Sequence, residues 1–152
     1  MSKDILYKAK RVDNGEWVCG LPIYKNYIRV FTEHEYEFED GRKTKYSTTK
    51  DYQVDPKTMC EFTGLIDKNK NKIFEHDIVD YEDCPASDYY RETIIVNRGV
   101  IEFEDGAFFV TNRETVEMDD LVYKGVVECS VVGNIFDNPE LLEKKELNET
   151  SI

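Results

Sequence analysis

The sequence predicts a mainly β protein with an N-terminal β-hairpin unit, a small C-terminal β unit and a short C-terminal helix. Ten Tyr and eight Phe favour half-buried pleated surfaces. Short alternating runs are also repeatedly separated by Asp, Asn and Gly turn signals. The 152 residues suffice for one domain with a core or for two small β units packed together.

The first hairpin is expected at the N-terminus. Residues 5–10 alternate loosely, Asp13-Asn14-Gly15 is a strong turn signal, and residues 17–20 return as the second strand.

The longest strand is expected over residues 27–39. From Glu33 its alternation is strict, and a period of two places four carboxylates on one face. That face carries Glu33, Glu35, Glu37 and Glu39, and the other carries His34, Tyr36 and Phe38.

A two-residue turn at Asp40-Gly41 is expected to return the chain, so that Glu39 faces Arg42 and Glu37 faces Thr44. Two interpretations of the acidic face remain open. It is either a solvated hairpin face or an acidic ribbon that mimics nucleic-acid phosphates or engages a basic partner.

A boundary is expected near Asp55, because Pro56 interrupts any central strand there. This gives an N-terminal β unit over 1–54, a second unit over 55–147 and a frayed tail over 148–152. Within the second unit, residues 62–79 read as strand, hydrophilic turn at 67–72, and a second strand opening near Asp77.

The turn resembles a calcium loop, because Asp67, Asn69 and Asn71 alternate. The calcium template then requires Gly at Lys72 and Glu at Ile78, so a lysine-rich turn between strands is the better interpretation.

Further strands are expected over residues 93–96, 99–103, 107–110 and 126–132, with a turn at Asp105-Gly106. Their spacing is typical of a small antiparallel barrel or sandwich. A short helix is expected at the end, with a capping side chain at Asp137-Asn138, Pro139 at its first position, and docking by leucines. These leucines are Leu141, Leu142 and Leu147.

The net charge of −12 argues against ordinary duplex DNA binding unless positive charges cluster. No apolar run approaches the roughly 18–20 residues of a membrane span, and no apolar signal core follows Met1, so neither membrane insertion nor secretion is expected. The four cysteines have no paired metal or redox spacing and are expected to be small buried hydrophobes. They are Cys19, Cys60, Cys84 and Cys129.

A basic and aromatic cluster is the best candidate for nucleic-acid contact in the second unit. It consists of Lys68, Lys70, Lys72 and Phe74, and its alternative is a solvated turn. The chain has no phosphate-cradling glycine loop, and neither His34 nor His76 stands in a nucleophile context. No catalytic residue, metal ligand or cofactor is therefore predicted, and the protein is not expected to be an enzyme.

Three stretches of the sequence carry a resemblance to a known family, in that family's order. They are residues 8–20 with Gly15-Glu-Trp-Val-Cys-Gly20, residues 54–79 with Thr63-Gly-Leu-Ile-Asp-Lys-Asn69 and Ile73-Phe-Glu-His-Asp-Ile-Val79, and residues 132–142 with Val132-Gly-Asn-Ile-Phe136. Together they resemble the YopX family of phage and prophage proteins. The resemblance implies a C-terminal part similar to a small SH3-like barrel, and it implies no activity or cofactor. Family members usually carry glycine where Lys70 and His76 stand, which leaves the geometry of those two turns open.

These observations rank three functions. The leading hypothesis is a non-enzymatic phage accessory protein in the bacterial cytoplasm, which contacts a host or phage protein. The alternative is a small barrel that binds single-stranded nucleic acid. A metal-dependent hydrolase is the remote third, since it rests only on the abundance of carboxylates. Open strand edges are consistent with self-association.

Overall fold

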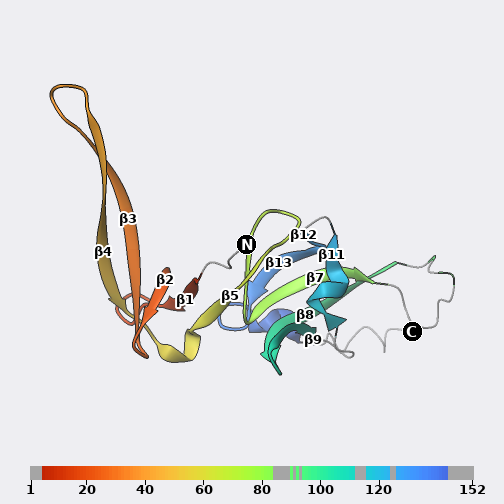
Figure 1. Ribbon diagram of the computed structural model, residues 1–152. Helices are drawn as coiled ribbons and strands as arrows, with labels where there is room; N and C mark the ends of the chain where they lie inside the picture. The colour runs from red at the N-terminus through yellow and green to blue at the C-terminus, as the bar shows by residue number, and fades with distance from the viewer. Residues whose placement is uncertain are drawn as a thin grey trace. The chain divides into compact units, whose positions relative to one another are not determined.

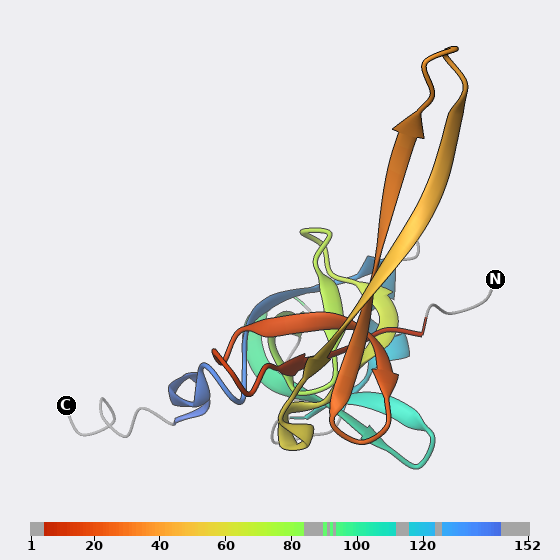
Figure 2. The same cartoon turned by 90° about the vertical axis from the view of Figure 1, so that its left-hand side faces the viewer.

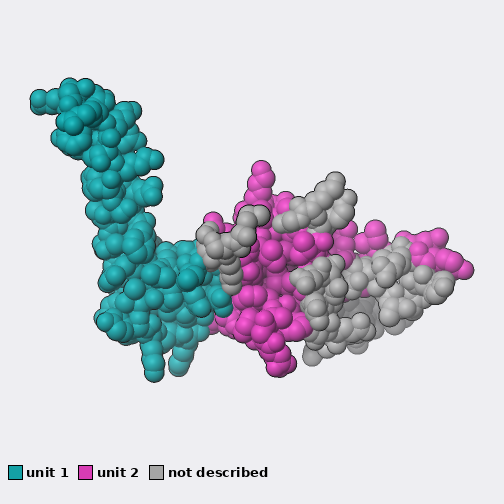
Figure 3. Space-filling model, viewed as in Figure 1, with its two compact units in different colours: residues 1–62 teal, residues 63–152 magenta. Residues whose placement is uncertain are grey.

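A computed structural model describes residues 5–83, 90, 92, 94–111, 116–123 and 126–143. The chain divides into two compact units, residues 1–62 and residues 63–152 (Figure 3). The boundary expected near Asp55 falls inside the first unit. Both units are built mainly from antiparallel strands, which confirms the predicted class.

Unit 1 is a single antiparallel sheet. It contains β1 (Tyr7–Lys10), β2 (Trp17–Ile23), β3 (Tyr27–Glu37) and β4 (Lys43–Gln53), in the spatial order β4-β3-β2-β1 (Figure 1). The 3-10 helix η1 (Pro56–Thr58) then leads into β5 (Cys60–Ile66), whose first residues pair with β1. Both predicted N-terminal hairpins are therefore present.

The core of unit 1 is small and lies at one end of the long strands. Ala9, Ile28 and Val54 are fully or almost fully buried, and Tyr7, Val18, Val30 and Met59 pack against them. Because β3 continues well past Ile28, most of its length extends beyond this core.

The outer parts of β3 and β4 form a two-stranded ribbon. β2 accompanies β3 only as far as Arg29, whereas β3 and β4 stay paired from Tyr27↔Gln53 to Glu37↔Lys43. We call residues 30–50 the ribbon. Figures 1 and 2 show it extending away from the rest of unit 1.

Unit 2 contains the end of β5, which pairs with β6 (Lys72–Phe74), and a five-stranded antiparallel sheet in the order β10-β9-β8-β7-β13. Its strands are β7 (Asp77–Asp83), β8 (Ile95–Glu104), β9 (Ala107–Thr111), β10 (Val116–Glu117) and β13 (Cys129–Asn134). A separate pair is formed by β11 (Val122–Tyr123) and β12 (Val126–Val127), and η2 (Met118–Leu121) is a 3-10 helix. The core includes Ile73, Val79, Tyr81, Ile101, Val110, Met118, Val127 and Cys129.

The described residues of this unit form no closed barrel, and the SH3-like detail expected for it is not confirmed. The sheet is open, with β10 at one edge and β13 at the other.

Local turn chemistry was predicted better. Asp105 and Gly106 have φ values of 52° and 84°, which is the primed two-residue turn expected between β8 and β9. The expected short helix is present as the 3-10 turn η3 (Pro139–Leu142), with proline at its start.

The predicted capping of this helix is wrong. Asn138 makes no side-chain cap, because its Oδ1 accepts a hydrogen bond from the backbone N–H of Asn134 at 3.2 Å. None of the four helix residues is buried, and Leu142 is exposed. Leu147 and the expected frayed tail over 148–152 lie outside the described residues.

Candidate functional site

The loop at the ribbon tip sets which side chains face each other. The backbone N–H of Phe38 donates to the carbonyl of Arg42 at 2.7 Å, and the N–H of Gly41 donates to the carbonyl of Phe38 at 2.9 Å. Gly41 has φ of 88°, the left-handed conformation that closes a three-residue hairpin loop. The predicted two-residue turn is therefore wrong, and the register shifts by one residue, to Glu37↔Lys43 and Glu35↔Lys45.

One face of the ribbon has mixed charge. We call the odd-numbered positions 31–37 and 43–49 the mixed-charge face. Three of the four predicted glutamates lie on it, Glu33, Glu35 and Glu37, opposite Ser47, Lys45 and Lys43. The Lys43 ammonium lies 3.5 Å from a carboxylate oxygen of Glu35. Glu39 lies in the tip loop and does not continue the row.

This pairing weakens the phosphate-mimic interpretation, because lysines now compensate two of the three carboxylates at the distance of cross-strand neighbours. The partner-binding role of the four glutamates stays a prediction.

The other face of the ribbon is aromatic. We call the even-numbered positions 30–38 and 42–50 the aromatic face. Tyr36, Phe38 and Tyr46 are exposed on it, by 52 %, 39 % and 50 %. The register places His34 opposite Tyr46, and their rings stack with centroids 5.0 Å apart. Tyr36 and Phe38 meet edge to face, also at 5.0 Å.

The aromatic face carries two cations. The Arg42 guanidinium lies 5.1 Å from the centre of the Phe38 ring, and the Lys50 ammonium lies 5.0 Å from the centre of the Tyr52 ring, which is outside the ribbon. Arg42 also pairs with Asp40 of the tip loop at 2.6 Å. No Asp or Glu occupies any position of the aromatic face.

The charge of the chain is divided unequally between the units. Residues 1–62 contain eleven Lys and Arg and eleven Asp and Glu, so their formal charges cancel. Residues 63–152 contain nine Lys and Arg and 21 Asp and Glu, which accounts for the whole net charge of −12. The ribbon therefore belongs to an electrically neutral unit.

The lysine turn predicted for nucleic-acid contact lies in unit 2. Lys68, Lys70 and Lys72 are exposed there. Phe74, however, is only 6 % exposed, and its backbone N–H donates to Asp77 Oδ2 at 2.9 Å. In the described part of unit 2 the Phe74 ring is therefore buried and not accessible beside these lysines. The nucleic-acid-binding role of Phe74 and the three lysines stays a prediction.

Asp67 anchors this turn from inside the unit. Its buried carboxylate accepts backbone hydrogen bonds from Asn69 at 2.9 Å, Asn71 at 2.7 Å and Val131 at 2.9 Å. Burial raises the pKa of this carboxyl, but the hydrogen bonds outweigh burial and leave its pKa below the ordinary value. The motif that resembles a calcium loop is thus a carboxylate-anchored turn. The described residues contain no group of three or more His, Cys, Asp or Glu that could hold a metal ion.

The two turns at which the resemblance implies glycine keep a glycine-like backbone. Lys70 and His76 have φ values of 68° and 70°, in the left-handed region. The backbone of His76 is held by bonds to Ile101 and Ile135, at 2.7 and 3.1 Å. Its ring contacts Phe136 edge to face, and Nδ1 lies 3.5 Å from a Glu102 carboxylate oxygen. His76 is therefore a turn residue with packed neighbours.

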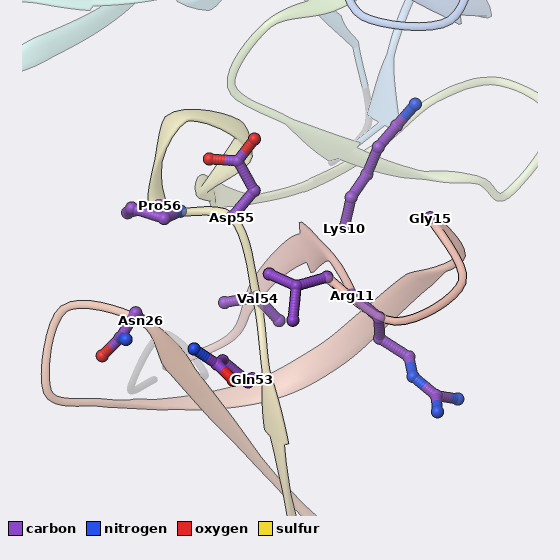
Figure 4. Close-up of a pocket in the computed structure, with 9 residues that line it drawn as sticks. Lys10, Arg11, Gly15, Asn26, Gln53, Val54, Asp55 and Pro56 are labelled. Atoms are coloured by element: carbon purple, nitrogen blue, oxygen red, sulfur yellow. The ribbon is translucent and has the colours of Figure 1, made fainter.

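An open cleft of about 520 Å³ lies in unit 1 and is lined by Lys10, Arg11, Asn26, Gln53 and Val54, among others (Figure 4). Arg11 points away from it in Figure 4, forms a bidentate pair with Asp13 and lies over the Tyr52 ring at 4.6 Å. Because the Arg11 guanidinium makes its contacts outside the cleft, we assign no ligand to the cleft.

The YopX family profile, described as "YopX protein", matches residues 6–143. The chain belongs to the YopX family. This confirms the resemblance carried by the three sequence stretches. The crystal structure of protein EF1440 from Enterococcus faecalis is similar to this YopX protein, with a TM-score of 0.55 and 24 % identity over 93 % of this chain and 100 % of the other. That similarity shows a shared fold. No curated protein matches the chain.

None of the helices in the described part of the chain has the length and apolar character needed to cross a membrane.

Proposed function

We propose that this YopX protein is a non-enzymatic binding module and that the ribbon is the element that contacts its partner. The observation that carries the proposal is the row of exposed aromatic rings, Tyr36, Phe38 and Tyr46, on one face of the ribbon. The small core of unit 1 does not include any of them.

Such rings favour binding on energetic grounds. Burial of one large apolar side chain contributes roughly 1.5–3 kcal/mol. Tyr and Arg are also enriched among the residues that dominate interface energies, and the aromatic face contains both. A partner that covers three half-exposed rings therefore gains part of this free energy at each ring.

The rings are also held in place before binding. The β3–β4 ladder fixes their backbone, His34 stacks on Tyr46, and His34 Nε2 lies 2.8 Å from Thr48 Oγ1. Side chains that are already ordered lose less conformational entropy when the partner binds.

The motifs shared with phage and prophage proteins support a place among phage accessory proteins in the bacterial cytoplasm. Host and phage macromolecules are both available there as partners. The hydrolase hypothesis has no named site to support it, since it rested on carboxylate abundance alone.

Affinity capture from host lysate tests the proposal. The tagged full chain is compared with a variant carrying Tyr36→Ser, Phe38→Ser and Tyr46→Ser, and with Phe31→Ser as the matched control. Phe31 is a 55 % exposed ring on the mixed-charge face of the same ribbon. We expect the triple variant to lose its partners and Phe31→Ser to retain them. Equal capture by all three proteins would refute the role of the ribbon.

A further inference from the structure

Resting on the proposed function, we infer that the aromatic face of the ribbon binds single-stranded nucleic acid, with bases on Tyr36, Phe38 and Tyr46 and phosphates beside Arg42 and Lys50. This moves the nucleic-acid contact from the lysine turn of unit 2 to the neutral unit 1.

Charge is segregated on the ribbon. The chain has 32 Asp and Glu, yet none occupies a position of the aromatic face, while Glu33, Glu35 and Glu37 all lie on the opposite face. Asp40 of the tip loop pairs with Arg42, but the positions of the face itself carry rings and cations, which complement a partner that is both anionic and rich in flat rings. Single-stranded nucleic acid has both properties.

The exposed rings lie close together on the aromatic face. Tyr36 and Phe38 already touch edge to face, with centroids 5.0 Å apart, so a base would lie on their exposed sides and not between them. A flexible single strand can place successive bases against such rings. A duplex keeps its bases stacked on one another and offers these rings no base face.

Unit 1 offers no net electrostatic repulsion to phosphates. Its formal charges cancel, so the phosphate backbone meets no net negative charge there. The two cations of the aromatic face are Arg42, which also pairs with Asp40, and Lys50, which lies over Tyr52. They allow about two contacts with phosphates. With about two contacts, the logarithm of the affinity should fall with the logarithm of salt concentration with a slope of about −1.4.

Fluorescence anisotropy with the full chain tests the inference directly. The probes are labelled poly-dT and poly-rU of about 20 nucleotides and a duplex of equal length, in about 50 mM salt and then at higher salt. We expect both single strands to bind, with a shallow salt dependence, and the duplex to bind more weakly.

Two pairs of variants locate the contact. Each ring removed from the aromatic face should weaken binding by about tenfold, and Phe31→Ser should leave it unchanged. Lys50→Glu should weaken binding more than Lys45→Glu, although both change the net charge equally, because Lys45 lies on the mixed-charge face. Unchanged urea midpoints would show that each variant is folded.

Failure of single strands to bind at low salt would overturn the inference, as would binding that ignores the aromatic variants or favours the duplex. The inference can fail while the proposed function holds. Ring-dependent capture of a protein that persists after nuclease treatment, with no binding of single strands, would leave the ribbon as the binding element and overturn nucleic acid as its partner.

Discussion

The carboxylate of Asp67 accepts a hydrogen bond from the backbone N–H of Val131 at 2.9 Å, across 64 residues of sequence. The same carboxylate accepts bonds from Asn69 and Asn71, so the 67–71 turn is tied internally and to β13 of the same unit. A side chain in a short turn therefore fixes a long-range contact of unit 2.

Asp67→Asn should destabilise the protein by about 2–4 kcal/mol, because the amide places donors where backbone N–H groups need acceptors. Urea denaturation measures the loss. Asp105→Asn is the matched control, since Asp105 is exposed in a two-residue turn and Asn tolerates its positive φ. Equal stabilities of the two variants would show that the Asp67 bonds contribute little.

Stability should also fall in acid through the same residue. Hydrogen bonds keep the folded-state pKa of Asp67 below its ordinary value, despite burial. Its contribution is therefore complete above the unfolded pKa of about 3.9 and is lost as the pH falls through the folded pKa. Urea midpoints of the wild type should drop more steeply below about pH 4 than those of Asp67→Asn. Parallel curves would contradict this account.

Lys70→Gly should stabilise the protein by about 0.5–1 kcal/mol. A left-handed residue with a Cβ costs about 1–2 kcal/mol, and the extra freedom of glycine in the unfolded chain removes part of the gain. Lys72→Gly is the control, because Lys72 lies in β6 and glycine weakens strands. The comparison requires urea midpoints of both variants, and a destabilised Lys70→Gly would show that the turn is not strained.

The thiol of Cys129 should be inert in the folded protein. Burial, together with the negative charge of Asp67, raises its pKa to about 12. Thiolate is the reactive form, so alkylation mapped by mass spectrometry at about pH 8 should modify Cys129 only after denaturation. Rapid labelling of Cys129 in the native protein would show that unit 2 opens readily.

The ribbon register has a direct spectroscopic test. NMR cross-peaks should join Tyr36 to Thr44 and His34 to Tyr46, as the three-residue tip loop requires. Cross-peaks between Glu37 and Thr44 would instead support a two-residue turn, in which Glu37 does not pair with Lys43.

The sequence predicted the elements whose causes are local. The Asp105-Gly106 turn, the alternation in β3 and Pro139 at a helix start depend on nearby residues, and each was found in place. The two-residue turn predicted at Asp40-Gly41 was wrong, because the same dipeptide suits both a two-residue turn and the end of a three-residue loop. The choice between them sets whether Glu37 meets Thr44 or Lys43.

Features that depend on distant pairing were not predictable in the same way. Barrel closure depends on whether the strands at the two sheet edges meet, and no local pattern reports that. The partner of Asp67 in β13 and the burial of Phe74 also come from tertiary packing. The alternation of the sequence places His34, Tyr36 and Phe38 on one face. Tyr46 joins that face only through the pairing of β3 with β4. The zero net charge of unit 1 follows from the sequence only when the boundary between the units is known.

The ribbon extends past the core of Ala9, Ile28 and Val54, and beyond Arg29 it has no third strand. Of the described core residues of unit 1, only Val30 belongs to the ribbon, so the exposed side chains of the ribbon are not needed to hold the rest of unit 1 together. Substitutions on its faces then alter recognition while leaving the global unfolding free energy almost unchanged. Natural variation can therefore exchange one partner for another at this position at little cost to the fold that carries it.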